Sequence, residues 1–298
     1  MKRAARIIFF VVLLLGFMAF AIKPLLIFLA QEKLLHLFAG SKVSIAHCKP
    51  GLRQVTFSNI EVKKEPLYDF KINEARISYN LKYRSLKLDS LNYLGFKLSK
   101  ASLELSPIKE GELSIQELKY DKLKVEELKS RLNREGNRWL LTSLSAKLWD
   151  GRIQGNLSLE FDKAPGYLAN LNFINCSLES LIKELDWGEK LRISGLLDGK
   201  IVLEGRGADM NVLSGDFSTH QPGGVFIIKD RRWLERLSWG SNQSLDILVE
   251  SFKNYNYNTG VIKLSLEKNN LILGLALDGD AGKRNLDIIV HGFKLGRR

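Results

Sequence analysis

Few residues of this sequence combine the types and the spacing that catalysis or metal binding requires. His47 and Cys48 are adjacent potential metal ligands, but neighbouring residues of a strand point to opposite faces and do not readily share one ion. Asp278 and Asp280 could form an acid–base pair or bind calcium, yet the sequence GDAG around them favours a turn. His220 lies in a loop without a nearby carboxylate or nucleophile. We therefore predict a protein without catalytic residues, metal sites or cofactors.

Two glycine-containing segments resemble phosphate-binding loops only superficially. The sequence GLLDGK at residues 195–200 is one residue too short for a phosphate loop, and Ile201 stands where Ser or Thr should follow. Gly205-Arg206-Gly207 lacks the third glycine of a dinucleotide-binding loop, because Met210 occupies that position. Asp-Gly pairs favour type I′ turns between strands. They predict hairpins at Asp150-Gly151, Asp198-Gly199 and Asp278-Gly279.

Hydrophobic and polar residues alternate over most of the chain after residue 40. A period of two predicts antiparallel strands with one apolar and one polar face. The alternation changes parity between Ile72 and Ala75, which predicts a bulge or a turn there. Two segments have helical spacing instead: Ser177–Asp186, with Ser177 as the N-cap, and Asp230–Leu237. The sequence thus predicts a mainly β fold with two or three short helices.

The N-terminal residues have the pattern of a membrane-spanning helix. The apolar run Ile7–Ile22 follows a basic cluster, and a second apolar patch extends to Ala30. One helix over both would be roughly 36 Å long, enough to cross a hydrocarbon core of about 30 Å. The basic cluster stays cytoplasmic by the positive-inside rule. Residues 1–39 are therefore predicted to be a membrane anchor and its helical continuation. The residues that set this topology are Lys2, Arg3, Arg6 and Lys23.

A cleaved signal peptide is the alternative interpretation of this segment. Ala19-Phe20-Ala21 has the small-x-small form of a cleavage site. Cleavage there would leave an apolar mature N-terminus, which is better explained by a helix that continues out of the membrane. Both interpretations place the rest of the chain outside the cytoplasm.

The chain is basic, with 45 Lys and Arg against 33 Asp and Glu and a formal net charge of +12. Subtracting the three basic residues that precede the apolar run leaves +9 for the exported part, dispersed along the sequence. No long stretch alternates basic with aromatic residues as a nucleic-acid-binding surface does. The excess charge therefore predicts attraction to an anionic membrane surface rather than to nucleic acid.

The residues after the anchor follow a characteristic order of helix end and strands. In order, they are Gly40 at the helix end, Val43 and Ile45, Phe57, Ile60 and Val62, Phe70 to Tyr79, and Leu86 with Leu88. This order resembles the N-terminal unit of the AsmA-like superfamily, of the AsmA, TamB and YdbH type. The phrases LWDGRIQGNLSLEF and ISGLLDGKIVLEGRG resemble the glycine-punctuated hairpins of that superfamily. The last third, from Gly223, resembles the YdbH-type C-terminal domain, with an abbreviated end after Gly279.

The resemblance implies an elongated, twisted antiparallel β-sheet curled into an open groove with an apolar interior. The exported domain would span residues 40–298, with a sub-boundary near 190–222. Such a groove binds or transports phospholipid between the inner and outer membranes and supports outer-membrane biogenesis. The implied location is the inner membrane, with a single pass and most of the chain in the periplasm. The implied partners are phospholipid acyl chains, an anionic membrane surface and other envelope proteins.

The candidate groove residues are apolar positions of alternating strands. They are Leu103, Leu105, Leu157, Leu159, Phe161, Leu271, Leu273, Leu275 and Leu277. Ordinary sandwich core is the other interpretation of these residues. The alternative function is accordingly that of a structural or scaffold envelope protein with a closed β-core that acts through protein partners. A third possibility is an exported hydrolase with an unrecognised site.

The sequence leaves open whether Cys48 and Cys176 form a disulfide.

Overall fold

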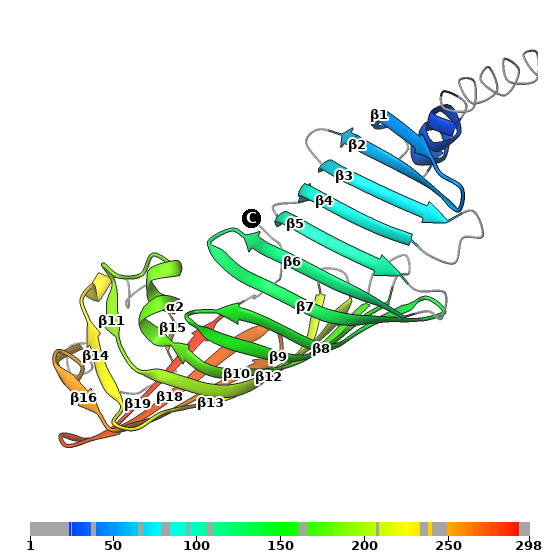
Figure 1. Cartoon of the computed structure of the whole chain (residues 1–298). Coiled ribbons are helices and arrows are strands. Elements are labelled where there is room, and N and C mark those ends of the chain that lie inside the picture. The colour runs from blue at the N-terminus through cyan, green and yellow to red at the C-terminus, as the bar shows by residue number, and fades with distance from the viewer. Residues whose placement is uncertain are drawn as a thin grey trace, which may run out of the picture. The chain divides into compact units, whose positions relative to one another are not determined.

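Figure 1 shows a computed structural model of the chain, which consists mainly of antiparallel strands. The structure describes residues 24, 26–36, 40–64, 68–78, 84–93, 96–105, 110–160, 166–206, 209–232, 238–239 and 249–291. The chain divides into two compact units, Met1–Asp121 and Lys122–Arg298. The expected sub-boundary near 190–222 falls inside the second unit. The boundary between the units instead follows strand β6.

Unit 1 consists of a helix and a sheet in which strands that follow one another in sequence pair antiparallel. The strands are β1 (Lys42–Pro50), β2 (Gln54–Lys64), β3 (Tyr68–Ser78), β4 (Arg84–Tyr93), β5 (Phe96–Leu105) and β6 (Glu110–Tyr120). Residues 26–36 are helical. Leu26, Ile27, Ala30 and Leu34 of this helix pack against the buried apolar residues of β1 and β2. The apolar core of unit 1 therefore lies between the helix and the first strands.

The predicted membrane anchor lies mostly outside the part of the chain that the structure describes. Residues 1–23, which include the topology residues Lys2, Arg3, Arg6 and Lys23, lie outside the described residues. Within the described ranges, no helix is both long enough and apolar enough to cross a membrane.

Apolar residues lie directly opposite one another across all the strands of unit 1. One row contains Ile45, Ile60, Ile72, Leu88, Ala101 and Ile115, and the next contains Cys48, Phe57, Ala75, Leu86, Leu103 and Leu113. Strands β1, β2 and β3 have two residues between these rows where strict alternation would have one, whereas β4, β5 and β6 have one. Asn59, which lies in this interval of β2, has φ of 53°. The register between β3 and β4 shifts at Ile72, which confirms the predicted irregularity before Ala75.

Unit 2 contains a larger antiparallel sheet, a small sheet and helix α2. The strands of the large sheet, in spatial order, are β7 (Leu123–Glu135), β8 (Arg138–Leu148), β9 (Gly151–Glu160), β10 (Gly166–Ser177), β12 (Leu196–Arg206), β13 (Asp209–Thr219), β17 (Thr259–Glu267), β18 (Asn270–Gly279), β19 (Gly282–Val290) and β15 (Ser238–Trp239). No described strand joins its first strand to its last, so the sheet is open. The small sheet contains β11 (Leu191–Ile193), β14 (Gly224–Ile228) and β16 (Tyr255–Tyr257).

Helix α2 (Leu178–Glu184) forms where the sequence predicts it. Ser177 is its N-cap, and the hydroxyl of Ser177 accepts a hydrogen bond from the backbone N–H of Ser180 over 3.2 Å. A bulge at Asn175, with φ of 53°, interrupts the pairing of β10 with β12, which resumes at Cys176 and Ser177 just before the helix. The second predicted helix, Asp230–Leu237, lies partly outside the described residues. Within its described part, residues 231 and 232 are helical.

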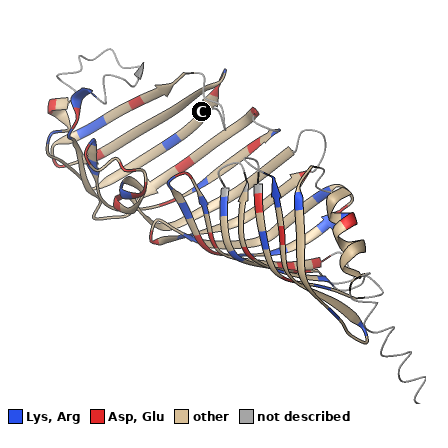
Figure 2. Cartoon of the chain, turned by 90° about the horizontal axis from the view of Figure 1, so that it is seen from above, with Lys and Arg blue, Asp and Glu red and all other residues tan. Residues whose placement is uncertain are grey.

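The two faces of the large sheet differ in polarity along its whole width. One row on the polar face consists, strand by strand, of Ser145, Gln154, Asn172, Lys200, Asp216, Lys263, Gly274 and Asp287. Cations and anions thus alternate on adjacent strands, which favours pairing across them. Figure 2 shows charged residues of both signs interspersed along the strands. The prediction of dispersed charge on one-sided strands is confirmed for the described strands.

Two of the three Asp-Gly pairs lie beside hairpin turns, each displaced from the predicted position. Between β8 and β9 the loop residues are Trp149 and Asp150, with φ of 50° and 57° as a type I′ turn requires. Gly151 is therefore the first residue of β9 rather than part of the turn. Between β18 and β19 the turn occupies residues 280–281, beyond Gly279.

The predicted hairpin at Asp198-Gly199 is wrong, because both residues lie inside β12 and pair with strands on both sides. Gly199 stands between Phe173 and Phe217, and the ring of Phe217 occupies the space where a side chain would lie. The carboxylate of Asp198 accepts a hydrogen bond from the backbone N–H of Asn175 over 2.7 Å. The glycine is thus explained by packing against an aromatic ring, not by a turn.

A methyl group at Gly199 has no room in this packing. An ideal Cβ there would lie 2.3 Å from Cδ1 of Phe217 and 2.5 Å from the carbonyl oxygen of Asp216. We expect Gly199→Ala to lower the free energy of unfolding by about 1–3 kcal/mol, because the partner strand must shift. At Gly188 the same atom would meet nothing within 4 Å, so Gly188→Ala should change stability by less than about 0.5 kcal/mol. Urea denaturation followed by tryptophan fluorescence measures both, and equal losses would contradict the packing described.

Candidate functional site

The apolar face of the large sheet in unit 2 contains two continuous rows of directly opposed residues. The first row consists of Ala146, Ile153, Phe173, Gly199, Phe217, Ile262, Leu275 and Leu286. The second row consists of Leu144, Gly155, Leu171, Ile201, Gly215, Leu264, Leu273 and Ile288. Each row crosses the sheet from β8 to β19 without a polar side chain. The sheet therefore presents a wide hydrocarbon surface on one side.

The two rows differ in their exposure to solvent. Most of the large side chains of the first row are buried, namely Ile153, Phe173, Phe217, Leu275 and Leu286, whereas Ile262 is half-buried. In the second row, by contrast, most of the large side chains are only half-buried, namely Leu171, Ile201, Leu264, Leu273 and Ile288. The apolar surface thus continues beyond the part of it that the protein covers.

The cover over the C-terminal strands consists of α2, β11, β14 and β16, which we call the cap. Figure 1 shows α2 lying over one face of the sheet with β11 and β14 nearby. An apolar cavity of about 130 Å³ lies between the cap and the sheet. Its lining is hydrophobic throughout: Leu178, Leu181, Ile182, Trp187, Leu191, Ile193, Phe226, Ile228, Ile262, Leu273, Leu275, Leu286 and Ile288. Both rows contribute to this lining, so the cavity adjoins the half-buried second row.

The cap is fixed to the sheet by buried aromatic residues. Phe252 contacts Phe226 and Tyr255 edge to face, with ring centroids 4.9 Å and 5.8 Å away. The hydroxyl of Tyr255 donates to the carbonyl oxygen of Gly282, in the hairpin of β18 and β19, over 2.6 Å. The hydroxyl of Tyr257 donates to the carbonyl oxygen of Ser194 over 2.5 Å. Of these contacts, the hydrogen bond of Tyr255 joins the cap to the large sheet, and the others join parts of the cap to one another.

The predicted groove residues are divided between the two units. Leu103 and Leu105 lie half-buried in β5 of unit 1. Leu157 and Leu159 lie half-buried in β9 of unit 2, and Phe161 lies outside the described residues. The four leucines of β18 share one face, on which Leu273 and Leu275 line the cavity while Leu277 is buried and Leu271 is half-buried. The structure therefore brings two of the nine predicted residues together in the cavity.

Most of the cavity lining was not identified from the sequence. Ile262 and Leu286 occupy alternating apolar positions of β17 and β19, so the period-two signal was present for them. Phe226 and Ile228 come from the short strand β14, and Leu181 comes from α2. These residues face the sheet only because the chain folds back over it, a contact that no local pattern specifies.

The residues considered for catalysis or metal binding do not form a site among the described residues. No group of three or more metal-ligating side chains occurs in that part of the chain. His220 does have a carboxylate neighbour, contrary to the sequence interpretation, because its Nε2 lies 2.8 Å from a carboxylate oxygen of Asp198. Cys48 and Cys176 are both buried thiols. Burial raises the pKa of the Cys176 thiol, which makes it a poor nucleophile.

Comparison of the chain with protein-family models, with curated proteins and with solved structures yields no match. The resemblance to the AsmA-like superfamily therefore remains a prediction from the sequence pattern.

The contact between Tyr257 and Ser194 gives a pH-dependent prediction. Burial raises the pKa of Tyr257 to about 12, whereas an unfolded tyrosine has a pKa of about 10. The folded state therefore holds this proton more tightly, and the stability that it contributes is complete below pH 10 and lost as the pH rises toward 12. We expect the unfolding free energy of the wild type to fall by on the order of 2 kcal/mol more than that of Tyr257→Phe over this range. Urea titrations at pH 8, 10 and 11.5 test this, and parallel pH profiles would contradict it.

Proposed function

We propose that the apolar face of the sheet binds the acyl chains of phospholipid, in an envelope protein held at the inner membrane by its N-terminal segment. The observation that carries the proposal is the cavity of about 130 Å³, which has a wholly hydrophobic lining and adjoins a half-buried apolar row. We extend the proposal to transport of phospholipid between membranes and to outer-membrane biogenesis, because the sequence resemblance to the AsmA-like superfamily implies these functions. No catalytic step is required of any residue.

The physical chemistry of the second row favours an apolar ligand. Apolar surface left in water costs about 25 cal/mol for each Å², so covering Leu171, Ile201 and Leu264 with a hydrocarbon chain is favourable. Each methylene buried contributes about 0.8 kcal/mol. A dry cavity of about 150 Å³ lined by aliphatic and aromatic side chains is large enough to accept benzene. The cavity under the cap is of comparable size and suits the end of an acyl chain.

The N-terminal part of the chain supports a membrane location. The helix at residues 26–36 packs one side on the core of unit 1, and its other side exposes Phe28, Leu29 and Leu35. In the sequence, this helix follows the apolar run Ile7–Ile22. A bilayer surface would cover these side chains, and the net charge of +9 that remains after subtracting Lys2, Arg3 and Arg6 favours an anionic one.

A pair of neighbouring substitutions on β18 tests the use of the apolar face. Leu273 lines the cavity, whereas Ile272 is half-buried on the opposite face of the strand, across from Ser265. Leu273→Gln would place an amide in the hydrocarbon environment at a cost of about 1–3 kcal/mol. We expect it to weaken lipid binding by about 5- to 100-fold, and Ile272→Gln to leave binding unchanged.

The measurement is photo-crosslinking of the full chain, reconstituted in vesicles, to a phospholipid with a diazirine near the acyl terminus. Peptide mass spectrometry should locate crosslinks in β17, β18 and the cap, and Leu273→Gln should lose them. Thermal unfolding of both variants shows whether each is folded. Crosslinks confined to residues 1–36 would refute the proposal and favour the scaffold function, in which the apolar face is a closed core that acts through protein partners.

A further inference from the structure

A second cavity, of about 680 Å³ and of polar character, lies beside α2 in unit 2. Helix α2 has two different sides. Leu178, Leu181 and Ile182 line the apolar cavity, whereas Ser180 and Glu184 line the polar one. The remaining wall of the polar cavity comes from β7, from the hairpin of β8 and β9, and from the end of β10. Its residues are Lys124, Glu126, Lys147, Leu148, Trp149, Asp150, Gly151, Arg152, Ile174 and Asn175.

Basic and acidic side chains balance in this wall. The basic ones are Lys124, Lys147 and Arg152, and the acidic ones are Glu126, Asp150 and Glu184. A cavity with equal numbers of both signs gives no electrostatic preference to a net anion over a zwitterion. It does offer separate partners to a ligand that contains both a cation and an anion.

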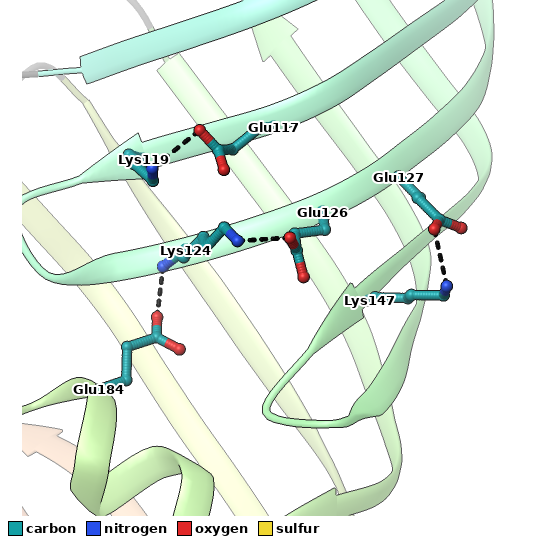
Figure 3. Close-up of polar contacts among 7 residues, drawn as sticks. All are labelled: Glu117, Lys119, Lys124, Glu126, Glu127, Lys147 and Glu184. Carbon is teal, nitrogen blue, oxygen red and sulfur yellow. Dashed lines mark hydrogen bonds and ion pairs between the residues drawn. The ribbon is translucent and has the colours of Figure 1, made fainter.

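Several of these groups already interact within the wall. The ammonium group of Lys124 lies 2.5 Å from a carboxylate oxygen of Glu126, and Glu184 accepts a hydrogen bond from the backbone N–H of Lys124 (Figure 3). Lys147 pairs with Glu127 over 2.7 Å (Figure 3), and the hydroxyl of Ser180 donates to Asp150. Figure 3 also draws the pair of Glu117 and Lys119 in unit 1, 2.9 Å apart, which is not part of the wall. The acidic side chains are thus held in place around the cavity.

Two donors of the wall have no acceptor in the described part of the chain. Arg152 lies on β9 directly opposite Lys147 of β8, which is also a cation. The guanidinium of Arg152 forms no ion pair with any described residue. The indole nitrogen of Trp149 is buried and has no hydrogen-bond partner there. A guanidinium binds phosphate oxygens in a bidentate manner, and an indole N–H is a donor only. Both groups are suited to an anionic oxygen supplied by a ligand.

The carboxyl group of Glu184, in contrast, is suited to a cation supplied by a ligand. Burial is the largest influence on Glu184 and raises the pKa of its carboxyl group above the usual value. A positive charge placed beside this partly buried carboxylate would stabilise its ionised form.

The polar cavity borders the apolar face at two residues. Leu148 lines the polar cavity and follows Ala146 of the first row at the next alternating position of β8. Trp149 stacks on Phe173 of the first row, with ring centroids 5.9 Å apart. Arg152 and Lys147 alternate with Ile153 and Ala146 of the first row, so the hydrocarbon part of a molecule with its polar head in this cavity would reach the apolar face around the turn at Leu148 and Trp149.

We propose that the polar cavity binds the headgroup of a zwitterionic phospholipid, with the phosphodiester at Arg152 and Trp149 and the ammonium group among Glu126, Asp150 and Glu184. This inference rests on the proposed function, because it assumes that acyl chains occupy the apolar face. It adds the class of lipid that the site selects.

The test uses the full chain in vesicles and three photoactivatable lipids with identical acyl chains. The first has a phosphoethanolamine headgroup and the second a phosphoglycerol headgroup. The third is diacylglycerol, which has no headgroup. We expect the phosphatidylethanolamine probe to label unit 2 at least fivefold more than either of the others. Arg152→Gln should reduce its labelling about tenfold, the usual scale of one charge-assisted hydrogen bond, and leave diacylglycerol labelling unchanged. Arg138→Gln, at the other end of β8 and also exposed, is the matched control and should have no effect.

A second variant isolates the contribution of the ammonium group. Glu184→Gln keeps the carbonyl oxygen that accepts the Lys124 N–H and removes only the charge. It should abolish the preference for phosphatidylethanolamine over phosphatidylglycerol, without a change in the midpoint of thermal unfolding.

The outcomes separate the two proposals. Labelling of unit 2 by none of the three probes refutes both. Equal labelling by diacylglycerol and phosphatidylethanolamine refutes the headgroup site and leaves the acyl-chain proposal standing. Stronger labelling by phosphatidylglycerol refutes the selection of a zwitterion. A loss of labelling in Arg138→Gln equal to that in Arg152→Gln also refutes the site, because the effect would then be one of general charge.

Discussion

The strands of the sheet all direct their apolar residues to the same side, and this apolar face must be covered or remain in contact with water. The positions of the helices and of the cap depend on this constraint. Antiparallel pairing places the apolar residues of adjacent strands directly opposite one another, so one-sided strands add up to continuous rows. A shift of one residue in any strand would move its apolar residues to the polar face. In unit 1 the alternation slips between the two described rows in β1, β2 and β3 but not in β4, β5 and β6, and the register shift between β3 and β4 keeps both rows opposed across the strands.

Each unit covers a different portion of its apolar face. In unit 1 the helix at residues 26–36 covers the buried residues of β1 and β2, while the apolar side chains of β4 and β5 remain half-buried. In unit 2 the cap covers the first row at β17 to β19 and leaves the second row partly open. Glycine takes part in this packing, because the ring of Phe217 fills the space beside Gly199 and contacts the position beside Gly215. An acyl chain is the ligand that would complete such a surface without any polar contact.

Helix α2 connects the two proposals physically. It is short, yet its residues divide between a cavity lined only by hydrocarbon and a cavity lined by balanced charges. An amphipathic ligand has the same division within one molecule. The aromatic contact between Trp149 and Phe173 marks the border between the two environments, where an indole ring has an apolar body and a polar N–H.

The sequence by itself determined the class of fold, the sidedness of the strands and the position of α2, because a period of two and an N-cap with helical spacing are local signals. It placed Leu273 and Leu275 on the correct face for the same reason. The sequence wrongly predicted a turn at Gly199, which lies inside β12. A glycine that makes room for a ring on the next strand and a glycine that permits a turn cannot be distinguished from local sequence. Only the tertiary structure decided which apolar residues become a cavity and which a half-open row. That choice depends on the return of β11, β14 and β16 over strands distant in sequence, and burial is a property of such long-range contacts rather than of the strands themselves.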